Sequence, residues 1–135
     1  MHEWSLADAV VRAIINIANK HKARRVVRVK LRLGRLQPID TEIFLTALKN
    51  LSLNTIIEGA KFEIINEDAR FKCNNCGKTW SLSDVKEKLD NSIIEMVHFI
   101  PEVIHAYLNC PYCGSPNFTI ISGRGVTIEE VEVET

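Results

Sequence analysis

Four cysteines are the residues of this 135-residue chain whose types and spacing best suit metal chemistry. They form two Cys-x-x-Cys-Gly motifs at residues 73–77 and 110–114. The two-residue spacer lets both thiolates of a motif reach one ion, and the glycine permits the positive φ that closes the turn. Four thiolates arranged tetrahedrally suit Zn²⁺ and leave no coordination position for water or substrate. We therefore predict structural Zn(II), with no catalytic residues; the predicted ligands are Cys73, Cys76, Cys110 and Cys113.

The same cysteines allow other assignments, namely a redox dithiol, an iron–sulfur centre or disulfide bonds. Paired cysteines indicate metal more often than disulfide in the cytoplasm, where we expect this protein to reside. Glu3 and Asp8 stand where a secretory signal would be positively charged, and Arg12 interrupts the apolar run. No apolar stretch approaches the roughly 18 residues that span a bilayer, so no membrane association is expected.

The N-terminal Met1-His2-Glu3 offers a second set of metal donors. The α-amine, the backbone amide of His2 and its imidazole lie within chelating reach of one ion. If the amide deprotonates, these nitrogens suit a square-planar ion such as Ni²⁺ or Cu²⁺. A fourth donor could be the next amide, the Glu3 carboxylate or a histidine from elsewhere. The alternative is a frayed terminus that binds no metal.

Two histidines between the cysteine motifs, His98 and His105, are candidates for that fourth donor. Each could equally be a packed or surface histidine. Because His98 is farther from Cys110 and lies in a less regular part of the segment, we predict His98 as the nickel ligand. His21 follows the first predicted helix and is interpreted as a cation at its C-terminus.

The elements that must position these groups follow from hydrophobic periodicity. Ser5 and Asp8 have the spacing of a capping box, and the apolar residues that follow recur at helical intervals to about His21. Strict alternation over residues 27–33 predicts a half-buried strand. Asp40 or Thr41 is expected to cap a second helix, with Ile43, Phe44, Ala47, Leu48 and Leu51 on its buried side.

Residues 61–67 predict a further strand, and 131–133 alternate again near the end of the chain. We expect the last strand to return beside residues 26–33. The predicted fold is therefore α+β: a small sheet with two helices formed by both chain ends, plus an inserted zinc-ribbon-like lobe. The expected boundaries are 1–68 with 122–135 for the nickel-binding α/β domain and 69–121 for the zinc-binding domain. The lobe has little regular apolar pattern, so metal is expected to hold it together.

Charge narrows the possible functions. Basic and acidic residues both number 17, yet residues 20–35 hold eight of the basic ones. We interpret this run as a solvated strand face balanced by glutamates; a surface for an anionic partner is the alternative. No aromatic residues interleave with the charges, which argues against a nucleic-acid-binding zinc ribbon. No nucleophile has an evident histidine partner and no phosphate-binding glycine loop is present, so the chain is predicted not to be an enzyme.

Several of these motifs, taken together and in this order, resemble the HypA family of nickel chaperones for [NiFe]-hydrogenase maturation. The resemblance covers essentially the whole chain, and the longer segment between the cysteine motifs is similar to archaeal members. The matching stretches are Met1–Ala7, Val29-x-Leu31-x-Leu33-Gly34-x-Leu36, the two cysteine motifs with Ser115, and Gly123–Val126.

The resemblance implies a nickel-binding domain formed by both chain ends and a zinc-binding lobe between them. It implies Ni(II) as transient cargo, held by His2 with the N-terminal nitrogens. It also implies delivery to the hydrogenase large-subunit precursor together with a HypB-type nickel GTPase or ATPase. No nucleic-acid partner is expected.

Overall fold

The computed structural model describes residues 2–36 and 39–135. These residues form two compact units. Unit 1 comprises residues 2–32, 39–65 and 127–135, and unit 2 comprises residues 33–36 and 66–126.

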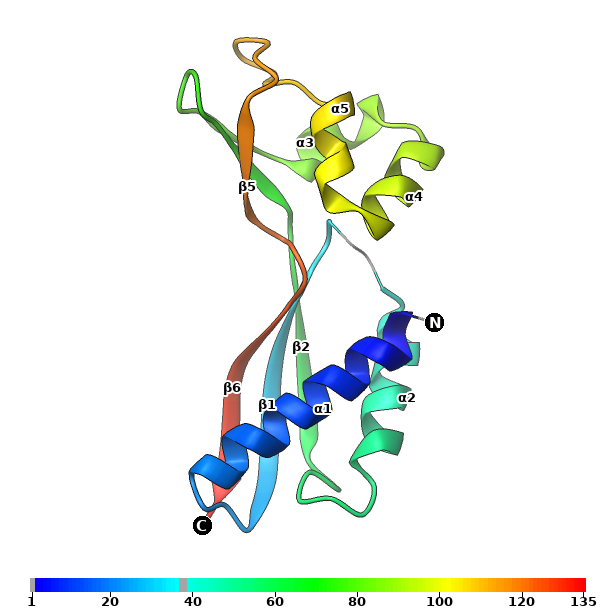
Figure 1. Ribbon diagram of the computed structural model, residues 1–135, viewed down its shortest axis with the longest axis vertical. Helices are drawn as coiled ribbons and strands as arrows, with labels where there is room; N and C mark the ends of the chain where they lie inside the picture. The colour runs from blue at the N-terminus through cyan, green and yellow to red at the C-terminus, as the bar shows by residue number, and fades with distance from the viewer. Residues whose placement is uncertain (1, 37–38) are drawn as a thin grey trace. The chain divides into compact units, whose positions relative to one another are not determined.

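Unit 1 contains a three-stranded sheet of order β2-β1-β6 and two helices (Figure 1). Its elements are α1 (His2–Lys20), β1 (Arg25–Gly34), α2 (Thr41–Ser52), β2 (Lys61–Glu67) and β6 (Val126–Glu134). The expectation that the last strand returns beside the first is confirmed, because β6 is hydrogen-bonded to β1. The α+β class, with a small sheet built from both chain ends, is confirmed with it.

Helix α2 buries one stripe of side chains against the rest of unit 1, including α1. Phe44, Ala47 and Leu48 are fully buried, as the periodicity predicts. Ile43 is 43% exposed, so its predicted place on the buried side is wrong. The buried stripe is centred on residues 44 and 48, and residue 43 is turned about 100° from it. Asp40 is the N-cap, its carboxylate accepting the N–H of Ile43 at 3.1 Å.

Helix α1 begins at His2, so the predicted start near Ser5 is wrong. The Ser5–Asp8 spacing of a capping box is also that of two neighbours on a helix surface, and sequence alone does not separate the two. Asp8 instead forms an i, i+4 ion pair with Arg12 at 3.1 Å. The apolar face is as expected; the buried residues of α1 are Ala7, Val10, Val11, Ile14 and Ala18.

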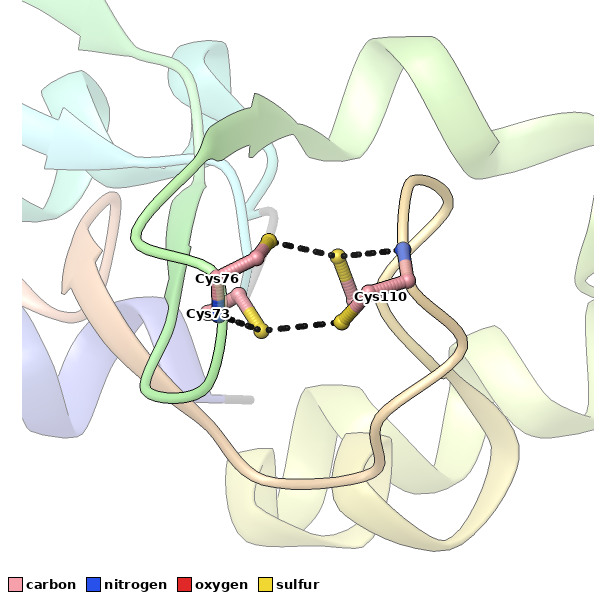
Figure 2. Close-up of side chains that lie close together, drawn as sticks. Cys73, Cys76 and Cys110 are labelled. Atoms are coloured by element: carbon pink, nitrogen blue, oxygen red, sulfur yellow. Dashed lines mark hydrogen bonds between the residues drawn. The ribbon is translucent and has the colours of Figure 1, made fainter.

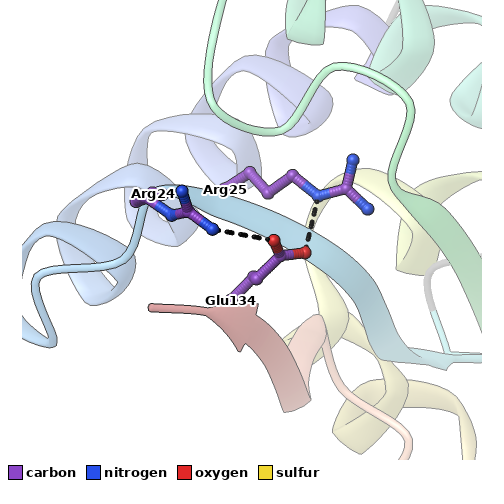
Figure 3. Close-up of polar contacts among 3 residues, drawn as sticks. All are labelled: Arg24, Arg25 and Glu134. Carbon is purple, nitrogen blue, oxygen red and sulfur yellow. Dashed lines mark hydrogen bonds and ion pairs between the residues drawn. The ribbon is translucent and has the colours of Figure 1, made fainter.

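The basic run is balanced by glutamates of neighbouring strands, which confirms its interpretation as a charged strand face. Glu134 at the end of β6 accepts from both Arg24 and Arg25, each at 3.1 Å (Figure 3). Arg28 pairs with Glu63 of β2 in the same way. Pairs this exposed contribute little to stability individually, on the order of 0–1 kcal/mol. Their effect is to neutralise the outer strand face.

Unit 2 contains a second antiparallel sheet, of order β4-β3-β5, and several short helical segments (Figure 1). The strands are β3 (Arg70–Cys73), β4 (Thr79–Ser81) and β5 (Phe118–Ser122). The helical segments are α3 (Leu82–Val85), η1 (Lys86–Lys88), α4 (Asn91–Phe99), η2 (Pro101–Val103) and α5 (Ile104–Tyr107).

Unit 2 has a hydrophobic core of its own, which the sequence did not predict; the expectation that metal also holds this region together stays a prediction. Phe71, Trp80 and Phe118, one from each strand, form a ring cluster with centroid separations of 5.4–5.6 Å. The helical segments contribute single buried residues, such as Val97 and Ile104. Sequence periodicity does not reveal this core, because each short element supplies at most three apolar side chains to it.

Two glycines allow a close backbone approach within unit 2. The N–H of Gly34 donates to the carbonyl of Gly125 at 2.8 Å, and the N–H of Leu36 donates to that of Gly123 at 3.0 Å. A Cβ on Gly34 would lie 2.1 Å from the Gly123 oxygen. Gly123 itself has φ +86° and lies against the backbone of Ala69. Glycine is therefore required at both positions.

Across the two described stretches, no helix combines the length and the apolar character needed to cross a membrane.

Candidate metal centre

The four cysteine sulfurs gather at one end of the β3–β4–β5 sheet. All four Sγ atoms lie within 4.8 Å of one another. The closest pairs join the two motifs, Cys73 to Cys113 at 3.6 Å and Cys76 to Cys110 at 3.7 Å. A tetrahedral ion with metal–sulfur bonds of about 2.3 Å requires sulfur–sulfur distances of about 3.8 Å. Figure 2 shows the sulfurs of Cys73, Cys76 and Cys110 turned toward a common point. The donor set fits one tetrahedral metal ion.

The first cysteine turn grows out of the end of β3. Cys73 pairs with Phe118 in the sheet, so the position of its sulfur is set by the strand register. The chain then reverses, with the N–H of Gly77 donating to the Cys73 carbonyl at 3.0 Å. Gly77 adopts φ +77°, the left-handed conformation expected of it. Backbone N–H groups of Asn75 and Cys76 donate to the Cys73 sulfur at 3.3 and 3.4 Å.

The second cysteine turn repeats this geometry after α5. The N–H of Gly114 donates to the Cys110 carbonyl at 2.9 Å, and Gly114 has φ +78°. The N–H groups of Tyr112 and Cys113 donate to the Cys110 sulfur at 3.4 and 3.5 Å. Each motif thus uses backbone amides to stabilise the negative charge of its first thiolate.

The four thiols differ in their surroundings. Cys73 and Cys110 are buried, whereas Cys76 and Cys113 are exposed. The backbone N–H of Ser115, and then the side-chain amide of Asn75, lower the pKa of Cys113 to about 6. The backbone N–H of Lys78 lowers the pKa of Cys76, but desolvation and the neighbouring thiols outweigh it and raise that pKa to about 11. A bound cation would favour the thiolate form of all four.

The cysteines are reduced, and their separations are far above the roughly 2.05 Å of a disulfide bond. Four sulfur donors with no exposed coordination position suit a structural ion, and Zn²⁺ is the common choice for such a set. Within residues 2–36 and 39–135, no other three or more His, Cys, Asp or Glu side chains are grouped to hold an ion.

The predicted nickel ligands at the N-terminus are described in part, because Met1 lies outside the described residues. His2 is exposed and opens α1. Glu3 is half-buried, and its carboxylate accepts the backbone N–H of Asp40, the N-cap of α2, at 3.0 Å. This bond anchors the first turn of α1 to the start of α2, both within unit 1.

The two candidate histidines lie in unit 2. His98 is half-buried near the end of α4, its ring 5.2 Å from that of Phe99. His105 stacks on Phe118 with centroids 4.3 Å apart and planes inclined by 29°. This contact gives His105 a packing role. His2 and Glu3 belong to unit 1, whereas His98 and His105 belong to unit 2.

Solved structures with the same fold are HypA proteins. The Ni metallochaperone HypA from Helicobacter pylori, solved in solution, superposes with a TM-score of 0.63 over 98% of this chain and 97% of that one, at 18% identity. Another solution structure, of a HypA protein, gives a TM-score of 0.64 over 98% and 96% at 20% identity. At these identities the likeness establishes the fold alone.

The sequence comparisons are closer. The Hydrogenase maturation factor HypA of Pyrococcus horikoshii is 50% identical over 134 residues, which cover 99% of this chain and 96% of the relative. The factor of the same name from Thermococcus kodakarensis is 47% identical with the same coverage, and that of Methanopyrus kandleri is 36% identical.

An α+β fold built from both chain ends, with a four-cysteine cluster in the intervening segment, defines a small metal-binding protein. Residues 1–133 match the family described as "Hydrogenase/urease nickel incorporation, metallochaperone, hypA". The chain belongs to the HypA family. It is therefore a nickel-incorporation metallochaperone and not an enzyme, which confirms the resemblance noted from its motifs.

Proposed function

We propose that this protein binds one Ni(II) ion at its N-terminus and delivers it to the large-subunit precursor of a [NiFe]-hydrogenase, together with a HypB-type GTPase or ATPase. The observation that carries this proposal is the sequence Met1-His2-Glu3 in a member of this family, with His2 and Glu3 in the first turn of α1. The relatives named hydrogenase maturation factors support the choice of recipient. We expect transfer to occur in the cytoplasm, where thiols stay reduced.

The proposed nickel ligands are the α-amine of Met1 and the amide and imidazole nitrogens of His2, with Glu3 and His98 as candidates to complete the set. The first four N–H groups of an α-helix have no acceptor within the helix. Metal binding by the His2 amide therefore does not require an intrahelical hydrogen bond to break. The bond from Asp40 to Glu3 supports an orienting role for that carboxylate.

The four-cysteine cluster is proposed to hold Zn(II) as a structural ion. The spacing of the sulfurs and the backbone amides directed at them support this choice. When bound, the ion supplies a crosslink between the two cysteine turns and no reactive coordination position.

Release of nickel follows from the chemistry of the proposed site. An imidazole and an amide nitrogen must lose protons to bind the ion, so acidification or competing thiolates from a recipient weaken the complex. Four thiolates in a filled shell resist both more strongly. Mild acid should therefore remove nickel before zinc, as metal analysis of the dialysed protein would show; simultaneous loss would contradict the separation of the two sites.

The test is a Ni²⁺ titration of zinc-loaded protein, followed by absorption spectroscopy. The native terminus is compared with the same chain acetylated at its α-amine, which removes that nitrogen as a metal donor. Only the native protein should bind one equivalent and show square-planar bands. Equal binding by both forms would refute the N-terminal site.

The contribution of His98 is tested separately with His98→Ala and, as the matched control, His105→Ala. Nickel affinity should fall in the first variant while zinc content stays unchanged. Unchanged nickel affinity in His98→Ala would remove that residue from the ligand set.

A further inference from the structure

The two cysteine turns are joined by side chains that are not themselves predicted ligands. The side-chain amide of Asn75, in the first turn, donates to the sulfur of Cys113, in the second, at 3.6 Å. The ammonium of Lys78, just beyond the first turn, lies 4.8 Å from the ring centroid of Tyr112 in the second. Both contacts run from the first turn to the second.

Asn75 is placed to influence the donor sulfurs of both motifs. Its backbone N–H donates to Cys73 at 3.3 Å, while its side chain reaches Cys113. The corresponding position of the second turn is Tyr112, whose backbone N–H donates to Cys110 at 3.4 Å. The Tyr112 ring contacts Lys78 and has no amide to offer. The side-chain bond to sulfur is thus a feature of the first turn.

Cys113 is one of the two exposed ligands, for which such a bond has the greater consequence. It is exposed, unlike Cys73 and Cys110, so solvent and competing ligands reach its sulfur. A hydrogen bond from a nearby amide lowers the electron density on a thiolate and restricts its side-chain rotation. The change in electron density shifts the charge-transfer bands of a bound metal, and the restricted rotation opposes loss of that sulfur from the ion.

We propose that Asn75 is a positioning residue of the metal centre, which holds the exposed Cys113 thiolate in its ligating orientation and slows its exchange. The inference rests on the proposed four-cysteine metal site. Residues that hydrogen-bond to metal ligands typically change affinity by about 10–100-fold when removed. Because the Asn75 bond is exposed, we expect the lower end of that range.

The test uses three variants of the full chain, Asn75→Ala, Asn75→Asp and Asn74→Ala. Asn75→Ala removes the donor, and Asn75→Asp replaces it with an anion of nearly the same shape beside a thiolate. Asn74 is the matched control, because its side chain donates to Asn117 at 2.9 Å and accepts from Thr119 at 3.1 Å. Neither bond involves a sulfur.

Each variant is loaded with Co²⁺ to record the thiolate-to-metal charge-transfer bands, and separately with Zn²⁺ to follow release to an excess of a chromogenic chelator. In Asn75→Ala the bands should move to lower energy, because the sulfur carries more electron density without its hydrogen bond. Zinc should leave about 10-fold faster, because the Cys113 side chain is freer to turn away from the ion. Asn75→Asp should exceed both changes. Asn74→Ala should keep the wild-type bands.

Asn75→Ala with wild-type bands and a wild-type release rate would overturn the proposal, as would equal band shifts in Asn74→Ala. If the wild-type protein binds no stoichiometric Co²⁺, or binds it without thiolate bands, the metal site and the role of Asn75 are overturned together. Normal uptake with no effect of the substitution would overturn the role of Asn75 alone.

Discussion

Phe71→Ala should destabilise unit 2 whether or not its metal ion is bound. Phe71 is fully buried, and its ring lies 5.6 Å from that of Trp80 and 5.5 Å from that of Phe118. Truncation of a buried phenylalanine to alanine costs about 3–5 kcal/mol. The two ring contacts account for about 1–3 kcal/mol of this, at about 0.5–1.5 kcal/mol each. The free energy of unfolding should fall by about 3–5 kcal/mol.

Urea unfolding monitored by tryptophan fluorescence measures this loss. The chain has two tryptophans, and a Trp4→Phe background leaves Trp80 as the only reporter, inside the cluster under study. Unfolding is recorded with saturating Zn²⁺ and again after chelation. Because unit 2 has its own core, chelated Trp4→Phe protein should retain a cooperative transition, and Phe71→Ala should weaken it in both states.

The matched control is Phe99→Ala, since Phe99 is 59% exposed on α4 and its truncation should change stability by no more than about 0.5 kcal/mol. A loss below about 1 kcal/mol for Phe71→Ala with zinc bound would refute the packing argument. Absence of any transition in the chelated background would show that the core cannot hold unit 2 without metal.

Three further predictions concern stability at low pH, two glycines and the cysteine thiols. The Ser81 backbone N–H, and then its hydroxyl, lower the pKa of Asp84 from 3.8. The ionised carboxylate therefore stabilises the folded protein above about pH 4, and this contribution is lost as the pH falls through the lowered pKa. Asp84→Asn should make thermal stability less pH-dependent below about pH 4. Gly123→Ala should cost about 2 kcal/mol more than Gly125→Ala in urea unfolding: both have positive φ, but only Gly123 meets a neighbouring backbone. Chelated protein in denaturant should show four reactive thiols in a colorimetric assay; fewer would indicate a disulfide.

Helices and strands whose hydrophobic pattern extends over many residues were predictable from the sequence. The limits of β2 agree with residues 61–67, and α2 begins where the cap residues indicate. The pairing of β6 with β1 followed from alternating charge, since Arg32 and Glu129 lie on neighbouring strands and bond at 2.6 Å. In each case a pattern of five or more residues reported the local structure.

The core of unit 2 was not predictable, because its elements are too short to show a period. Helix α4 carries Val97 as its buried residue, and α5 carries Ile104. Their burial depends on contacts that close only in the folded unit. The start of α1 was missed for another reason: Ser5 and Asp8 satisfy a capping pattern equally well inside a helix.

The cysteine motifs predicted a cluster of four sulfurs, and the structure contains it. The bond from Asn75 to Cys113 could not be predicted from the sequence. It joins side chains 38 residues apart, which come together only when both turns have formed. The spacing of a motif identifies the donor atoms but not the neighbours that modify them.

The pairing of β1 with β6 also sets the order in which the protein can form during synthesis. The bond from Arg24 to Glu134 joins residues 110 apart in sequence, and β6 leaves the ribosome after the segments of unit 2. All the segments of unit 2 are made before it, so that unit can close its sheet and cysteine turns while the chain is still growing. Unit 1 must wait until β6 has emerged. Helix α1, although made before unit 2, belongs to the unit that is completed after it.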